Sequence, residues 1–328
     1  MRHLLVLMAL ACSAALGDPV HEHMLGAAEQ STDAGASHDL VGLVAGPAGV
    51  PLVAVASAGS VENIRRLSSE PGARLAFVQA DVYGALVERA RTGDPEARAL
   101  VERLRVFMPL FDEELHFIVR ADSPLRYVHE IAGQRLNVGP MGGGAAFTAT
   151  RVYARLFGHE LPLSDARFLS DEQALARLTG DRSVDVVAFV GGQPVPLLAG
   201  MTAQARQSIR LLAVDPAAPA TRVLVGPYAQ TAIRRESYPD WLVQDVPALA
   251  VGTLLMTRDY RTPAIRAQLA GLAQAMCRAA ARLRAQGHPK WKEADFDAPA
   301  LPTNWRYYPP SREVLAHCLA PSRGDTGP

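Results

Sequence analysis

The sequence predicts an α/β protein of two lobes, in which mostly parallel sheets are covered by helices. Its 328 residues exceed the usual ceiling for one hydrophobic core, and this length favours two lobes. From about residue 50, short apolar runs alternate with segments of helical period, which is typical of parallel strands joined by helices. Because 33 basic residues balance 33 acidic ones, no overall field favours nucleic acid, and we expect no nucleic-acid partner.

The N-terminus has the pattern of a signal peptide, which we assign to residues 1–17. A short basic start precedes an apolar run from Leu4 to Leu16, and Ala15 and Gly17 are small residues at the positions that a signal peptidase reads. The run is too short to span a membrane stably. We therefore expect cleavage before Asp18 and a periplasmic protein.

Three cysteines leave some questions open. Cys12 lies in a sequence similar to a lipoprotein cleavage box, so lipid anchoring there is an alternative, as is a first buried strand if the true start lies upstream. Loss of Cys12 would leave Cys277 and Cys318, which in an oxidising compartment would be able to form a disulfide. Their separation in space is not given by the sequence, so this pairing stays open.

The expected elements follow in chain order. In the first half we expect strands at 51–56 and 74–78, a helix with Ser60 as N-cap, a helix capped by Asp81, a helix from 95 to 104 and a strand at 115–120. In the second half we expect strands at 136–139, 184–190, 209–214 and 222–225, and helices from 145, at 171–178 and at 263–284.

A glycine-rich turn at residues 139–144 joins a strand to a helix. Such a turn exposes backbone N–H groups at the positive end of the helix dipole, which makes a seat for an anion. No lysine follows these glycines as a P-loop requires, and their GxxGGG spacing differs from the dinucleotide fingerprint. Both nucleotide interpretations are therefore weak.

The glycine turn is one of four loops that follow expected strands, the others being 57–63, 79–81 and 189–193. In open α/β sheets, ligands bind beyond the carboxyl ends of the strands. Two of the loops belong to each half of the alternation, so a cleft between two lobes would make them face one another.

Five segments in order resemble the TAXI family, the solute-binding subunits of tripartite ATP-independent periplasmic (TRAP) transporters. The segments are GSVENIRRL (59–67), LAFVQADV (75–82), VGPMGGGAAFTA (138–149), VDVVAFVGGQPVP (184–196) and QDVPALAVGTLLMTR (244–258). The resemblance implies a type II-like periplasmic binding protein with lobe I at 18–119 plus 222–328, lobe II at 120–221 and a ligand cleft between them.

The resemblance also implies a function. Members of this family bind small carboxylates such as glutamate or 2-oxoglutarate and deliver them to TRAP membrane permease subunits. We accordingly expect a monomer without cofactor or catalytic residues. A periplasmic sensory protein that hands its solute to a signalling partner, or a binding protein with a degenerate site, remains an alternative, and the sequence shows no proton-transfer pair for an enzyme.

The residues that we expect to contact the solute lie in the four loops. They are Ser60, Asn63, Gln79, Gly142, Gly143, Gly144, Ala145 and Phe189. Alternative roles are capping for Ser60, bonding of a neighbouring loop for Gln79 and core packing for Phe189. Arg151 and Arg167 are candidates to pair a second carboxylate because they lie near the loops of lobe II.

The sequence also departs from the family. Residues 17–28 read GDPVHEHMLGAA, without the tyrosines of the family's first turn, and Gly143 and Ala145 replace the usual Ser and Thr. The solute or its affinity therefore need not match those of the family. His21-Glu22-His23 lacks the spacing that places two histidines on one helical face, so we expect no metal site there.

Overall fold

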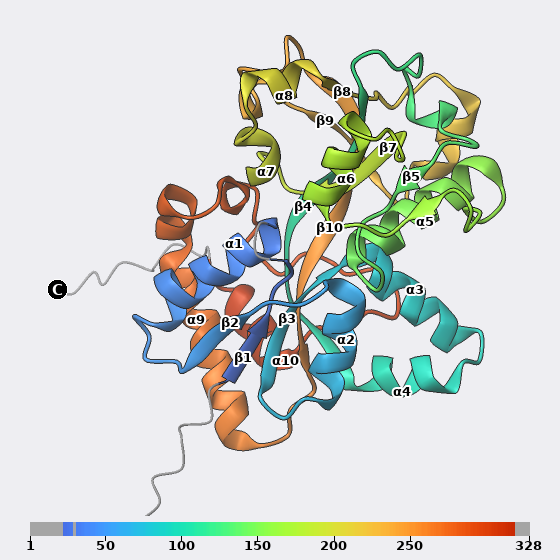
Figure 1. The fold of residues 1–328 in the computed structure, drawn as a ribbon. Coiled ribbons are helices and arrows are strands. Elements are labelled where there is room, and N and C mark those ends of the chain that lie inside the picture. The colour runs from blue at the N-terminus through green and yellow to red at the C-terminus, as the bar shows by residue number, and fades with distance from the viewer. Residues whose placement is uncertain (1–21, 29–30, 319–328) are drawn as a thin grey trace, which may run out of the picture.

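The computed structural model describes residues 22–28 and 31–318, and their strands form a single ten-stranded sheet. Eight strands follow the order β2-β1-β3-β10-β4-β7-β5-β6, while β8 pairs with β4 and β9 pairs with β10. Figure 1 shows two lobes, the first coloured mainly blue, teal and red and the second green and yellow. The predicted signal peptide, Cys12 and the residues from 321 onward lie outside the described residues. The α/β fold with parallel strands and flanking helices is confirmed.

Lobe I contains three parallel strands, β1 (Glu22–Leu25), β2 (Leu52–Val55) and β3 (Ala73–Gln79). Helices cover both faces of these strands (Figure 1). They are α1 (Thr32–Asp39) with a π-helical continuation (Leu40–Ala45), α2 (Ser60–Ser69), α3 (Ala80–Arg91), α4 (Pro95–Arg103), α9 (Pro263–Gln286), a 3₁₀ turn (Pro289–Lys292) and α10 (Pro309–Leu315).

Lobe II is built in the same way around β5 (Leu136–Asn137), which pairs in parallel with β6 (Ala166–Arg167) and β7 (Val186–Gly191). Its helices are α5 (Gly144–Phe157), α6 (Asp171–Thr179), α7 (Pro196–Ala199) and α8 (Ala203–Gln207), with 3₁₀ turns at Val128–Glu130, Pro219–Leu224 and Arg235–Ser237. Two short strands, β8 (Ile209–Leu211) and β9 (Ala229–Ile233), complete the lobe.

Two long antiparallel strands run through both lobes (Figure 1), β4 (Leu104–Arg120) and β10 (Val246–Arg258). The lobe I part of β10 pairs with β3, and its lobe II part pairs with β9. Likewise, residues 114–119 of β4 pair with β7. The sequence predicted only the last six residues of β4, because an acidic stretch, Asp112 to Glu114, interrupts its apolar pattern.

Alternation along the strands places a core on each face of each lobe. In β3, Leu75 and Phe77 pack on the α9 side, whereas Ala76 and Val78 pack against α2 and α3. In β7 of lobe II, Ala188 faces α5 and Phe189 faces α6. Each sheet face is thus buried, as expected for strands covered on both sides by helices.

Most expected elements are present, and the differences have local causes. Residues 222–225 do not form the predicted strand, because the chain makes the 3₁₀ turn Pro219–Leu224, which starts at a proline. The helix α2 has Gly59 as its N-cap rather than Ser60, and α3 has Gln79 rather than Asp81. Both predicted caps lie just inside their helices, because their side chains bond to other segments instead.

The division of the chain into lobes stays a prediction, and the packing favours a different placement of its boundaries. The strand β9 pairs with β10, and Ile233 and Tyr238 share a core with α6 of lobe II. These residues precede β10 and lie within 222–328, which the sequence assigned to lobe I. We therefore place both boundaries inside the long strands, near Asp112 in β4 and Gly252 in β10, which are paired.

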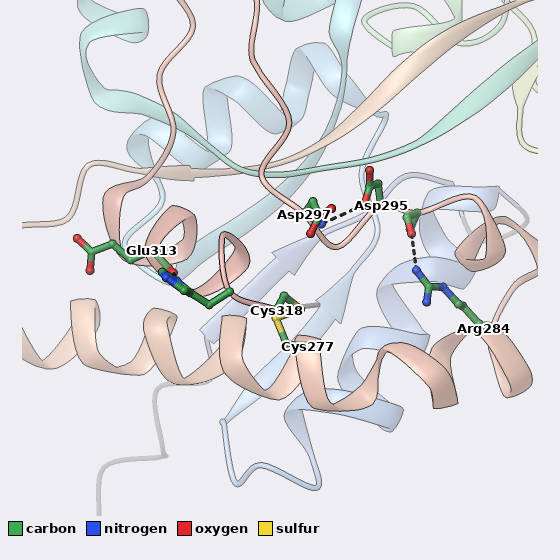
Figure 2. Close-up of a disulfide and its surroundings, with 8 residues drawn as sticks. Cys277, Arg284, Asp295, Asp297, Glu313 and Cys318 are labelled. Atoms are coloured by element: carbon green, nitrogen blue, oxygen red, sulfur yellow. Dashed lines mark hydrogen bonds between the residues drawn. A yellow bond between two sulfur atoms is a disulfide. The ribbon is translucent and has the colours of Figure 1, made fainter. Parts of the chain in front are cut away.

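A disulfide joins Cys277 of α9 to Cys318, which follows α10 (Figure 2). Their Cα atoms are 5.4 Å apart, and both cysteines pack against the core between α9 and the sheet. The open question of this pairing is thereby answered. The bond fastens the last described turn of the chain to the long helix of lobe I.

Removal of this disulfide by the double substitution Cys277→Ser and Cys318→Ser should lower the free energy of unfolding by about 2–4 kcal/mol, because the cross-link limits the freedom of the unfolded chain. Urea unfolding with and without a reducing agent measures this. The reductant should destabilise only the parent protein, and an equal response of the double variant would contradict the assignment.

Candidate solute-binding site

A cavity of about 380 Å³ lies between the two lobes. Its volume falls in the range that small-molecule sites usually have. Its lining comes from both lobes and consists of Ala27, Ala28, Ser31, Asp33, Ala58, Gly59, Ser60, Gln79 and Glu113 from lobe I, and of Pro140, Gly143, Gly144, Ala145, Ser170, Asp171, Glu172, Val190, Val195 and Leu197 from lobe II.

Four helices, α1, α2, α5 and α6, begin at the wall of this cavity. The first N–H groups of a helix have no partner within it, and the helix dipole is positive at that end. In α5, the N–H groups of Gly144 and Ala145 donate to no acceptor in the part of the chain that the structure describes. These groups therefore have hydrogen bonds left to donate at the wall of the cavity.

The glycines of this turn are required because the loop before α2 approaches them closely. A Cβ atom at Gly144 would lie 2.3 Å from Oε1 of Gln79 and 2.7 Å from Oγ of Ser60. A Cβ atom at Gly143 would lie 2.9 Å from the carbonyl oxygen of Ala58. The serine usual in the related family therefore has no room at position 143 in this arrangement of the lobes.

Ser60, which follows β2, and Gln79, the last residue of β3, are hydrogen-bonded to each other at the cavity. The backbone N–H of Gln79 donates to Oγ of Ser60 at 2.9 Å. The side-chain amide of Gln79 donates to Glu113 at 3.0 Å and accepts from Thr148 of α5 at 3.3 Å. Gln79 thus has the alternative role, bonding of neighbouring segments. It also lines the cavity.

Five of the eight predicted contact residues line the cavity, namely Ser60, Gln79, Gly143, Gly144 and Ala145. The other three lie elsewhere. The side chain of Asn63 is fully buried and donates to the carbonyls of Gly26 and Phe77, and Phe189 is in the core beneath α6. Gly142 lies in the turn, outside the lining. We therefore do not include these three in the proposed site.

Asp81 bridges the lobes at one side of the cavity instead of capping its helix. Its Oδ2 accepts from Thr148 of α5 at 2.8 Å and from the hydroxyl of Tyr228 at 3.1 Å. Burial raises the pKa of this carboxyl, while the hydrogen bonds from both hydroxyls lower it. These contacts hold α3 of lobe I against lobe II.

A second set of contacts bridges the lobes through residues 191–193. Thr32 of α1 exchanges two hydrogen bonds with the backbone of Gly192, which donates at 2.8 Å and accepts at 3.2 Å. Beside it, the buried ammonium of Lys290 lies 2.6 Å from Glu114, which also accepts from the backbone and side chain of Gln193 at 2.9 Å. The lobes are therefore in contact around the cavity.

Two buried acids in the cavity wall were not predicted, Asp33 and Glu113. Asp33 is 5% exposed and Glu113 is 3% exposed. Burial raises the pKa of Asp33 to about 7, and burial together with the charge of Asp33 raises that of Glu113. The acidic stretch in the middle of an apolar run, LFDEELHF at 110–117, was the available signal for Glu113.

The far wall adds Asp171 and Glu172 in the first turn of α6, where acids complement the helix dipole. No lysine, arginine or histidine is among the lining residues that the structure describes. Arg151 stacks on Phe147, and Arg167 donates to the carbonyls of Ser164 and Ala166. Neither arginine reaches the cavity to pair a second carboxylate.

Within the described ranges, no cluster of three or more His, Cys, Asp or Glu residues is arranged to hold a metal ion. His23, which lies on strand β1, hydrogen-bonds to Glu70 at 2.7 Å. His21 lies outside the described residues. In the same part of the chain, no helix has both the length and the apolar character needed to cross a membrane.

A sheet shared by two lobes, with a cavity of solute size between them, defines a fold like that of the periplasmic binding proteins. The family model described as the NMT1-like family matches residues 40–264, more than half of the chain. The chain belongs to this family. The narrower TAXI assignment is treated below as a proposal.

Several solved structures are similar to this chain, and one of them reaches a TM-score of 0.50. A structure described as a periplasmic transporter is 12% identical over 89% of this chain and 92% of its own, with a TM-score of 0.50. The periplasmic binding protein BugD is 13% identical over 90% of this chain and 93% of its own, with a TM-score of 0.48. The alkanesulfonate-binding protein SsuA from Xanthomonas axonopodis pv. citri, bound to MOPS, is 17% identical over 92% and 85%, with a TM-score of 0.45. At these identities a structural likeness shows only the fold. Our comparison of the fold rests on the periplasmic transporter, whose TM-score is 0.50.

The substitution Gly144→Ala should disturb the contact between the glycine turn and Gln79, because the added methyl group has no room there. We expect a loss of about 1–3 kcal/mol in the free energy of unfolding, as for overpacking elsewhere. The matched control is Gly271→Ala in α9, where nothing lies within 4 Å of the added atom. Equal unfolding midpoints in urea for both variants would contradict the close approach.

The contribution of Asp33 to the free energy of unfolding should fall as the pH rises from about 4 to 7, against the opposite contribution of buried His116, whose pKa is lowered to about 4. In this window the folded protein keeps a proton on Asp33, whose pKa is about 7, whereas the unfolded chain, with its ordinary value of 3.8, has released it. Glu113 and Asp171 act in the same direction, whereas Lys290 favours ionisation of Glu113. Asp33→Asn should flatten this dependence and stabilise the protein at pH 8.

Urea unfolding at pH 5, 6, 7 and 8 measures this dependence, with Asp297→Asn as the control because Asp297 is an exposed acid outside the cavity. An unchanged slope in Asp33→Asn would show that Asp33 is already ionised in the folded protein.

Proposed function

We propose that this protein is an extracytoplasmic solute receptor that binds a small carboxylate between its lobes, without chemical turnover. The observation that carries the proposal is the cavity itself, which both lobes line and whose wall includes Gly144 and Ala145, with N–H groups that donate to no described acceptor. A carboxylate oxygen accepts hydrogen bonds from such groups at a helix N-terminus. Val190, Val195 and Leu197 supply an apolar wall for the carbon chain of the solute.

The connection between the lobes supports a closing motion. Near the cavity, β4 and β10 are among the chain segments that connect the lobes. The register of their pairing shifts between Gly252 and Leu254. We propose that this irregularity is the hinge. The bonds from Asp81 to Thr148 and from Thr32 to Gly192 would break on opening, so the described arrangement corresponds to a closed state.

Delivery to the permease subunits of a TRAP transporter is the proposed use of this binding. It is supported by the ordered resemblance of five segments to the TAXI subunits and by membership of the NMT1-like family. The disulfide between Cys277 and Cys318 favours an oxidising compartment, in agreement with the predicted signal peptide. We propose that the receptor acts as a periplasmic monomer.

Thermal-shift and calorimetric screening of the purified protein against dicarboxylates, keto acids and amino acids tests the proposal. A bound solute should raise the melting temperature, since it stabilises only the folded state. The solute should be recovered unchanged, as judged by NMR. Gly144→Ala should weaken the binding more than Gly271→Ala does. If no carboxylate raises the melting temperature, the proposed function fails.

A further inference from the structure

We infer that the solute carries a cationic nitrogen, such as a protonated amine, and that Asp33 and Glu113 bind it. The inference rests on the proposed receptor function and specifies the class of solute. It predicts that the cavity discriminates between a carboxylate with an ammonium group and one of the same carbon skeleton without it.

The first observation is the state of Asp33. Its side chain lies in the cavity wall and is 5% exposed, and its Oδ1 is buried without a hydrogen-bond partner among the described residues. A buried carboxyl oxygen without a donor is unfavourable, and proteins rarely leave one so. An ammonium group in the cavity would supply the missing donor.

The second observation is the position of Glu113 beside it. This carboxyl also lines the cavity, and the negative charge of Asp33 disfavours its ionisation. Gln79 donates one hydrogen bond to Oε2 of Glu113, but its neutral amide does not balance the charge. Two neighbouring carboxyls of this kind are stabilised together when a cation binds between them.

In the described part of the chain, no basic side chain forms an ion pair with Asp33 or Glu113, although the charge of Lys290 favours ionisation of Glu113. The nearest candidate, the ammonium of Lys290, bonds to Glu114 at 2.6 Å and to Glu293 at 2.7 Å. The described lining contains no basic residue, and no described cluster fits a metal ion. The partner of Asp33 and Glu113 is therefore an organic cation that enters with the solute.

Two sets of groups in the cavity wall then select opposite charges. The N–H groups at the start of α5 donate to a carboxylate, while Asp33 and Glu113 accept hydrogen bonds from an ammonium group. An amino acid satisfies both. A dicarboxylate keto acid places its second negative charge in a cavity whose wall also holds Asp171 and Glu172, without a basic side chain to pair it.

Calorimetric titration with matched pairs of α-amino and α-keto acids tests this, with glutamate and 2-oxoglutarate and then alanine and pyruvate as probes. In each pair that binds, we expect the amino acid to bind about tenfold more tightly or better, as for one charged hydrogen bond. Asp33→Asn should lower the affinity for the amino acid by about tenfold and change that for the keto acid much less. Asp297→Asn is the matched control outside the cavity.

Glu113→Gln repeats the test on the second acid, so that the result does not depend on the folding of one variant. A keto acid that binds as tightly as its amino acid, or an affinity for the amino acid that neither variant changes, overturns the inference and leaves the receptor function standing. Binding of putrescine but of no carboxylate, lost in Asp33→Asn, supports the inference and overturns the carboxylate part of the proposed function.

Discussion

The passage of β4 and β10 through both lobes is the constraint on which the rest of this structure depends. Because β4 reaches the cavity between the lobes near its middle, its residue Glu113 is buried and yet lines the cavity. In β4 these residues are acidic. Glu114 is paired by Lys290, whereas Glu113 faces the cavity with only an amide donor from Gln79. The same strand thus supplies one structural and one accessible carboxylate.

The glycine turn and the acids have complementary tasks in the proposed receptor. Gly143 and Gly144 allow lobe II to approach the loop of Ala58 and Ser60, which a side chain would prevent. Close approach exposes the first N–H groups of α5 to the cavity and brings Thr148 to Asp81. In the proposed receptor, closure of the lobes and formation of the anion seat would therefore both follow from this one contact.

The comparison between sequence and structure shows where local patterns suffice. The strand–helix alternation predicted β2, β3, β7 and α9, because each buries a face whose period is visible in the sequence. The strand β1 and residues 104–114 of β4 were missed, since the former is short and the latter are interrupted by acids. Asp33 was also missed, because it lies before the first segment with a recognised motif. Its position on α1 brings it to the cavity.

By itself, the sequence determined the fold class, and it predicted the glycine turn as an anion seat and the order of the segments that indicate a solute receptor. These depend on neighbouring residues and on strand and helix periods. Only the tertiary structure decided that Cys277 and Cys318 are bonded, that Asn63 and Phe189 are structural, and that two acids share the cavity. Such facts depend on distances between residues far apart in the chain, for instance between Asp33 and Glu113, and local patterns carry no information on those distances.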